Sequence, residues 1–399
     1  MGQKLHRGRR SVFRKRRTGL KTFLGILLAV VIVASGYLAA MFLGPKGSAP
    51  VSNDAEPSAS QSAPASTAPT TPSTPAPPEA DKPVAVPSGL RGFYLPHAAL
   101  TDDGLPTTLS AAKQAGFTAV VFDLKDTEGR LYYRFSSPLA KQVNSYTKNA
   151  LTKAQLESLF ARIKEAGLIP VPRLHAFRDN LGAKALPNAR ISYKENPSWS
   201  WFDGPNTATA KRWLSARDND AHDYIGALAE ELKALGAGAV MLDSVQFPTP
   251  RLTTRASFGN DNAELKDGEV LTLFISKMKD LLGKDCPVIL GCTGESVLES
   301  ATQVYGDSNP LLTFAPTVGA PTLNPTTLKK SVKESVGTLL FRIDQIEDES
   351  HRPTLAPLLE VSDLSAAQVK QAMADCVAGG TDSYILYSAK GTYDFAAYQ

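Results

Sequence analysis

The stretch that decides the fold lies at residues 239–248 and reads AVMLDSVQFP. A run of apolar residues that includes the β-branched Val240 is typical of a short strand buried on both faces. The run ends at the carboxylate of Asp243 and soon meets Pro248, which cannot continue a strand ladder. Strands of parallel barrels end on polar functional side chains at one rim of the barrel. The stretch therefore predicts one strand of such a barrel, for which the chain must supply seven more.

Short apolar runs alternate with helix-period segments on both sides of this stretch. The predicted strands lie at residues 92–95, 119–122, 168–174, 239–242, 287–291, 311–315, 357–361 and 384–387. Helices are predicted between them at residues 105–115, 152–167, 221–235, 270–282, 326–336 and 365–380. This alternation predicts an α/β fold of the (β/α)8 TIM-barrel class. A doubly wound open sheet is disfavoured, because no Gly-rich phosphate turn follows the first strand.

The first 88 residues have a different composition. Residues 1–21 carry nine Lys and Arg and no acid, residues 22–44 are apolar and uncharged, and residues 45–88 are rich in Pro, Ala, Ser and Thr. These segments predict a cytoplasmic basic tail, a transmembrane signal anchor and a disordered linker. The barrel domain, residues 89–399, is then expected to be extracellular and attached to the cell membrane by this single span.

Charge and cysteine content limit the classes of partner and cofactor. Outside the basic tail, 34 Lys and Arg face 39 Asp and Glu, which argues against nucleic acid as a partner. The three cysteines form no CxxC or Cys/His cluster with zinc spacing. No cofactor is predicted and no metal site, although a metal-dependent hydrolase stays as a third alternative because His97 and His175 both follow strands.

Carboxylates stand where several predicted strands end. Asp123, Asp243 and Glu360 end strands directly, and Glu295 follows the fifth strand. Cleavage of a glycosidic bond requires two carboxyl groups, one that protonates the leaving oxygen and one that attacks or activates water. These four residues are the predicted catalytic candidates, with Asp243 first.

Residues expected to bind substrate lie at the same rim. All three tryptophans, Trp199, Trp201 and Trp213, fall in the long loop after the third strand, where sugar rings could stack on them. The alternative is that they give this loop a small core of its own. The remaining rim candidates are His97, Lys125, Asp126 and His175.

Three ordered motifs resemble a known family. Residues 120–131 (VVFDLKDTEGRL) look like a D-x-K-D-x-x-G signature, residues 173–179 (RLHAFRD) are similar to R-x-x-x-F-K-D, and residues 242–249 (LDSVQFPT) look like F-D-Y-I-R-F-P-T. Over about residues 90–395 the chain resembles a bacterial "putative glycosyl hydrolase" family, long catalogued only as a domain of unknown function. The resemblance implies a (β/α)8 barrel related to α-glycosidase-type barrels, in a secreted or anchored bacterial protein.

The resemblance also implies site residues. It places the catalytic Asp at Asp243, matches Glu295 and Glu360 by strand order alone, and adds Arg173 and Gln246 to the substrate-binding candidates. Ser244 and Gln246 stand where the family has Tyr and Arg.

Two hypotheses follow. One is a membrane-anchored glycoside hydrolase that cleaves a cell-wall or capsular polysaccharide. The other is a catalytically inactive barrel that binds envelope glycan as a scaffold. The sugar, the linkage and the choice between retaining and inverting chemistry stay open.

Overall fold

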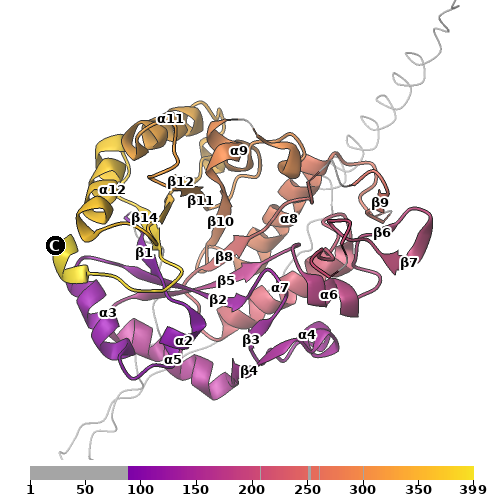
Figure 1. Cartoon of the computed structure of the whole chain (residues 1–399), viewed down its shortest axis with the longest axis horizontal. Coiled ribbons are helices and arrows are strands. Elements are labelled where there is room, and N and C mark those ends of the chain that lie inside the picture. Colours follow the sequence, from indigo (N-terminus) through magenta and orange to yellow (C-terminus); the bar gives the residue numbers. More distant parts are fainter. Residues whose placement is uncertain (1–88, 207, 250–252, 260, 300) are drawn as a thin grey trace, which may run out of the picture. The chain divides into compact units, whose positions relative to one another are not determined.

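The computed structural model describes residues 89–399, except for residues 207, 250–252, 260 and 300 (Figure 1). The predicted basic tail, membrane anchor and linker lie outside these residues. Within the described part of the chain, no helix is long and apolar enough to cross a membrane.

Eight parallel strands form a closed ring (Figure 1). They are β1 (Arg91–Tyr94), β2 (Ala119–Lys125), β5 (Ile169–His175), β8 (Val240–Asp243), β10 (Val288–Thr293), β11 (Val318–Leu323), β13 (Leu358–Glu360) and β14 (Tyr384–Tyr387). Each strand pairs in parallel with the next, and β1 closes the ring by pairing with both β14 and β2. The closure confirms the predicted barrel and rules out an open doubly wound sheet.

Helices cover the outside of the ring, as Figure 1 shows. The longer ones are α3 (Leu105–Gln114), α5 (Lys153–Glu165), α7 (Asn219–Ala234), α8 (Asp267–Leu282), α11 (Val332–Asp344) and α12 (Ala366–Gly379). The helices predicted at residues 152–167 and 365–380 correspond to α5 and α12, and each begins with a capping box, Thr152 with Gln155 and Ser365 with Gln368. In each box the hydroxyl satisfies one free N–H of the first turn and the amide side chain satisfies another.

The predicted sixth strand, residues 311–315, is wrong. Those residues fall largely in a short helix, α10 (Pro310–Thr313), where Pro310 occupies the first turn and the Asn309 side chain accepts from the next backbone amides. The sixth strand is β11, which reads VGAPTL. Its small residues and internal proline hide the apolar run that marks the other strands. The helix predicted at residues 326–336 begins only at Val332, after a capping box from Ser331 to Glu334.

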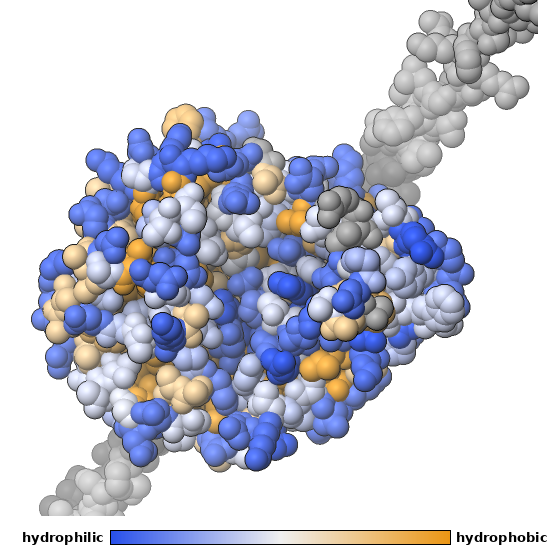
Figure 2. Space-filling model, in the orientation of Figure 1, coloured by the Kyte–Doolittle hydropathy of each residue, from blue (hydrophilic) through white to orange (hydrophobic). Residues whose placement is uncertain are grey.

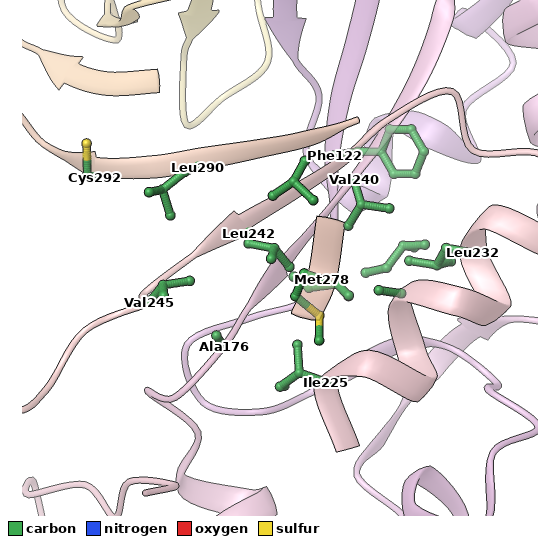
Figure 3. Packing of buried hydrophobic residues seen from close by; sticks show 14 of the residues in the cluster. Phe122, Ala176, Ile225, Leu232, Val240, Leu242, Val245, Met278, Leu290 and Cys292 are labelled. Atoms are coloured by element: carbon green, nitrogen blue, oxygen red, sulfur yellow. The ribbon is translucent and has the colours of Figure 1, made fainter. Parts of the chain in front are cut away.

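Two layers of apolar side chains hold the barrel together. The inner layer fills the ring, and the outer layer lies between the ring and the helices. Figure 3 shows Val240 and Leu242 of β8 in the outer layer, near Ile225 and Leu232 of α7 and Met278 of α8. All five are fully buried, and burial of each such side chain contributes about 1.5–3 kcal/mol.

Smaller elements sit on the loops that follow the barrel strands. The strands β3 (Leu131–Tyr133) and β4 (Tyr146–Leu151) extend the sheet beside β2, and β12 (Thr354–Leu355) pairs with β11. A separate sheet joins β6 (Ser192–Tyr193), β7 (Asn196–Ser200) and β9 (Ala256–Ser257). The first two come from the loop after β5 and the third from the loop after β8, so this sheet links two loops of the carboxyl-terminal rim.

Candidate active site

Alternation along the strands decides which side chains enter the barrel. The inner layer is built from every second residue, for example Ala119 and Val121 of β2, or Ala239 just before β8 and Met241 within it. We call these positions the inward rows. The next position on each inward row, at the carboxyl end of the strand, is no longer aliphatic and is polar or aromatic on most strands. The residues at this position are Tyr94, Asp123, Arg173, Asp243, Thr322, Glu360 and Tyr387, and on β10 it is Gly291, which has no side chain.

Asp123 and Arg173 form a two-point ion pair at this level. The Arg173 Nε and Nη2 atoms lie 2.5 and 3.1 Å from the two Asp123 oxygens, and the Tyr94 hydroxyl donates to Asp123 at 2.9 Å. Burial alone would raise the pKa of the Asp123 carboxyl, but the Arg173 guanidinium outweighs it and the net shift is downward. Asp123 is therefore held ionised with both oxygens already engaged.

Asp243 is the more open carboxylate. Its side chain is 29% exposed against 14% for Asp123, and its Oδ2 lies 3.5 Å from Arg173 Nη1. The Ser244 backbone N–H donates to its other oxygen at 2.6 Å. Gly291 lies on the neighbouring strand, and a Cβ there would stand 3.1 Å from the Asp243 carboxyl carbon. The missing side chain at Gly291 therefore keeps one side of Asp243 free. Asp123, Arg173 and Asp243 are called the inner cluster below.

His175 lies between the two carboxylates of the inner cluster. Its Nε2 is 3.9 Å from Asp123 and its Nδ1 is 3.9 Å from Asp243, while Nδ1 also meets the Ser244 hydroxyl at 2.9 Å. Ser244 has a left-handed backbone (φ 54°), which costs roughly 1–2 kcal/mol for a residue with a Cβ. Burial is the main cause that lowers the pKa of His175, assisted by the positive Arg173. The imidazole is thus neutral at neutral pH.

Two tyrosines complete this level. The rings of Tyr94 and Tyr387 have centroids 4.8 Å apart, and the Arg173 guanidinium lies 5.0 and 5.4 Å from them. Burial and then the Asp123 charge raise the pKa of Tyr94, so its phenol stays protonated. The sequence reasoning missed both residues, although each ends an inward row. In Figure 2 the face over the barrel is hollowed near its centre, and hydrophilic residues gather there.

The two remaining acid candidates occupy different positions. Glu360 ends the inward row of β13, is half-buried, and accepts from the Ser362 N–H at 3.2 Å and from the Ser362 hydroxyl. Glu295 lies in the first turn of α9 (Gly294–Leu298), where its side chain is exposed. Glu360 therefore shares the level of the inner cluster, whereas Glu295 lies outside the inward rows.

Lys125 does not enter the barrel. The register of β2 against β5 shifts between Asp123 and Lys125, so Lys125 pairs with Leu174, an outer-layer residue. Its ammonium lies 2.9 Å from Asp179 and also donates to the carbonyls of His175 and Ala176. Both side chains of this outer pair, Lys125 and Asp179, are fully buried, so Lys125 cannot reach a ligand in this arrangement.

Other predicted binding residues support loops. Asp126 accepts from the Tyr132 hydroxyl at 3.0 Å, and the Tyr132 ring lies 4.9 Å from that of His97. His97 Nε2 in turn meets the Asn149 carbonyl at 3.1 Å. Gln246 accepts weakly from the Tyr305 hydroxyl at 3.4 Å.

The three tryptophans differ in exposure. Trp201 and Trp213 are 2% and 5% exposed and belong to the hydrophobic core, and Trp213 donates to Asp203 at 3.0 Å. Trp199, on β7, is 64% exposed. The loop-core alternative thus describes the positions of Trp201 and Trp213, and only Trp199 offers its ring to solvent.

Metal-ligating side chains do not gather into a metal site in the part of the chain that the structure describes. In that part of the chain, no group of three or more His, Cys, Asp or Glu side chains could hold a metal ion. All three cysteines are free and buried, and burial raises the pKa of each thiol.

Comparison with known proteins gives one family. The family described as "Putative glycosyl hydrolase domain" matches residues 92–294, which include β1 to β10 and most of the polar level. None of the curated proteins matches the chain.

Solved structures resemble the chain only distantly. A hypothetical protein from Ruminiclostridium thermocellum ATCC 27405 is 18% identical, over 50% of this chain and 95% of its own, with a TM-score of 0.41. The Flavobacterium johnsoniae chitobiase is 12% identical, over 77% of this chain and 47% of its own, with a TM-score of 0.49. The glycoside hydrolase domain of PelA from Pseudomonas aeruginosa is 12% identical, over 77% of this chain and 97% of its own, with a TM-score of 0.43. The basis for assigning the barrel fold is therefore the strand pairing described above and not these similarities.

Proposed function

The chain belongs to the family described as the "putative glycosyl hydrolase domain", and we propose that it hydrolyses glycosidic bonds with Asp243 as the central carboxylate. One observation carries this proposal. Asp243 is a half-open carboxylate at the rim of the barrel, held by the Arg173 guanidinium and the Ser244 N–H but enclosed by neither. A nucleophile or base needs this combination of fixed position and free access.

Glu360 is the proposed partner acid. It ends an inward row, as Asp243 does, and lies on a strand separated from β8 by β10 and β11 around the ring. Two carboxyl groups on separate strands can flank a sugar placed between them. Its half-buried position is compatible with proton donation to a leaving oxygen. Glu295 is the weaker candidate, because it lies on α9 and not at the end of an inward row.

The other residues of the level have supporting roles in this proposal. Asp123 fixes the orientation of Arg173, and Arg173 in turn holds Asp243. Tyr387, which is half-buried, supplies ring surface against which a sugar can pack, and the buried Tyr94 supports it from the neighbouring strand. An ionised Asp123 also contributes negative charge near a transition state of oxocarbenium character.

The substrate and location are further parts of the proposal. The apolar segment at residues 22–44 and the following Pro-, Ala-, Ser- and Thr-rich linker support a barrel that is attached to the cell membrane and acts outside the cell. A cell-wall or capsular polysaccharide is the glycan within reach of an enzyme placed there.

The test uses the full chain and an Asp243→Asn variant. Reducing-end release from isolated cell-wall and capsular polysaccharides should fall by about 10²–10⁴-fold, because Asn cannot attack or accept a proton. Asp280→Asn is the matched control, since Asp280 lies exposed on α8. Full activity of Asp243→Asn would refute the proposal. Glycan binding without turnover by the wild-type chain would instead favour the scaffold hypothesis, which the Ser244 and Gln246 departures motivate.

A further inference from the structure

The small sheet of β6, β7 and β9 stands at the rim that carries the candidate active site. The loop after β5 supplies β6 and β7, and the loop after β8 supplies β9. These two barrel strands also carry His175 and Asp243. In Figure 1 the three short strands lie together at the side of the barrel. Their position extends the rim beyond the inward rows.

Trp199 is exposed on this sheet although its backbone is held. Its side chain is 64% exposed, against 2% for Trp201 two residues later. The residues around it are fixed, because the Arg190 side chain donates to the Ser198 carbonyl at 2.6 Å and the Trp201 N–H donates to Ile191 at 3.0 Å. Leaving a large indole in water gains nothing for folding. The Trp199 indole is therefore exposed on a stretch of backbone that is held in place, at the rim where a ligand can reach it.

Polar residues neighbour Trp199 in the chain and on the strand paired with β7. Ser198 and Ser200 flank it, and Asn196 begins the same strand. On β6 the Tyr193 ring is covered by the Arg255 guanidinium at 5.3 Å, and Arg255 pairs with Glu195 at 2.9 Å. A pyranose offers C–H groups to an aromatic face and hydroxyls to neighbouring polar groups. If an apolar protein surface docked here instead, the polar side chains near Trp199 would lose water without gaining hydrogen-bond partners.

We propose that Trp199 forms a second sugar-binding subsite, which stacks a pyranose unit of the same glycan at a distance from the bond that Asp243 attacks. This inference rests on the proposed function, because the ligand is an extension of the proposed substrate. A subsite on a separate sheet selects for chain length. Long glycans engage both the inner cluster and Trp199, whereas short ones engage the inner cluster alone.

The experiment measures binding in an Asp243→Asn background of the full chain, so that no probe is cleaved. The probes are hexasaccharides and disaccharides of the same linkage, from an array of β-1,4-linked N-acetylglucosamine, glucose and mannose and of α-linked glucans. Trp199→Ala should weaken hexasaccharide binding by about tenfold and leave disaccharide binding unchanged. Trp199→Phe, which keeps a flat ring, should recover most of the lost affinity.

Phe341→Ala is the matched control. Phe341 is 66% exposed on α11, an outer helix that carries no residue of the candidate site, and its truncation should change neither affinity. Equal hexasaccharide affinity for Trp199→Ala and its parent would overturn the subsite, as would failure of the parent to bind any hexasaccharide of the array. Loss of hexasaccharide binding in Trp199→Ala, in a chain whose Asp243 form hydrolyses nothing, would keep the subsite and refute the hydrolase. The two proposals therefore fail separately.

Discussion

The inner cluster and the outer pair each include one residue of β2 and one residue from β5 or the turn that follows it, but they differ in access to water. Asp123 and Arg173 face the barrel interior beside the partly exposed Asp243, whereas Lys125 and Asp179 are fully enclosed between the strands and the helices. The register shift of β2 after Asp123 separates the two groups. Because of this single irregularity in β2, Asp123 of the D-x-K-D motif faces the barrel interior, whereas Lys125 of the same motif is buried between the strands and the helices.

The outer pair also connects two sequence motifs. Lys125 belongs to the first and Asp179 to the second, and the Lys125 ammonium additionally holds the carbonyls that follow β5. Asp179 caps the helix α6 (Asn180–Ala185) by accepting from the Gly182 N–H at 2.6 Å. The outer pair thereby fixes the backbone next to His175. Changes to it should act on folding, while changes to the inner cluster should act on the reaction.

The largest effect is expected from Lys125→Met. The substitution leaves the Asp179 carboxylate buried without its counter-charge, which should lower the free energy of unfolding by about 3–5 kcal/mol. Urea unfolding of the full chain, followed by tryptophan fluorescence, measures the loss. The double variant Lys125→Met with Asp179→Asn removes the unpaired charge and keeps a capping side chain, so it should be more stable than the single variant. An unchanged urea midpoint for Lys125→Met would show that the outer pair is not structural.

Asp123→Asn should have the second-largest effect, and mainly on activity. Arg173 loses its two-point carboxylate partner and is left with Asp243 at 3.5 Å, which draws the guanidinium into a tight pair with the proposed nucleophile. We expect kcat to fall by about 10²-fold with little change in KM, because the loss acts on the reacting group and not on substrate contacts. The urea midpoint should fall less than in Lys125→Met. Wild-type kcat in Asp123→Asn would contradict the positioning role of the inner cluster.

Gly129→Ala tests the space around the outer pair and should have a smaller effect. Gly129 has φ 85°, and a Cβ there would lie 1.8 Å from an Asp179 oxygen. The strain and the displaced carboxylate together should cost about 2–3 kcal/mol of unfolding free energy. Gly116→Ala is the control for the backbone alone, since Gly116 has φ 83° and its nearest neighbour is the Arg91 guanidinium at 3.6 Å. Equal losses in the two variants would mean that the contact with Asp179 contributes nothing.

The barrel could be predicted from the sequence because its signals are local. Apolar runs and capping boxes depend on residues close together in the chain, and they located every barrel strand except β11, whose proline and small residues hide it. The direction of Lys125 could not be predicted in this way, because it depends on how β2 pairs with β5. The burial of Asp179 could not be predicted either, because it depends on the ion pair with Lys125, which lies 54 positions earlier in the chain.

Part of the site was within reach of sequence reasoning. Tyr94 and Tyr387 lie within the predicted strands at residues 92–95 and 384–387, in step with inner-layer residues, so extending the period-two pattern by one residue pair would have found them. Which tryptophan faces water could not be found, because Trp199 and Trp201 are close in sequence and differ only through the packing of the loop.

The smallest effect is expected in the pH dependence of stability, and it comes from His175, which lies between the two carboxylates of the inner cluster. Burial holds the pKa of His175 below its ordinary value, so between these two values the unfolded chain binds more protons than the folded chain. Stability from this group is therefore present above the ordinary histidine pKa of about 6.5 and is lost as pH falls through the window below it. His175→Gln removes this loss, and its unfolding free energy should decline less steeply than that of the wild type as pH falls below about 6.5. His97, His222 and Asp218 also have shifted pKa values, but they are present in both proteins and cancel in the comparison. Parallel pH profiles would mean that the inner cluster already accommodates a charged imidazole, because Asp123 and Asp243 flank its two nitrogens.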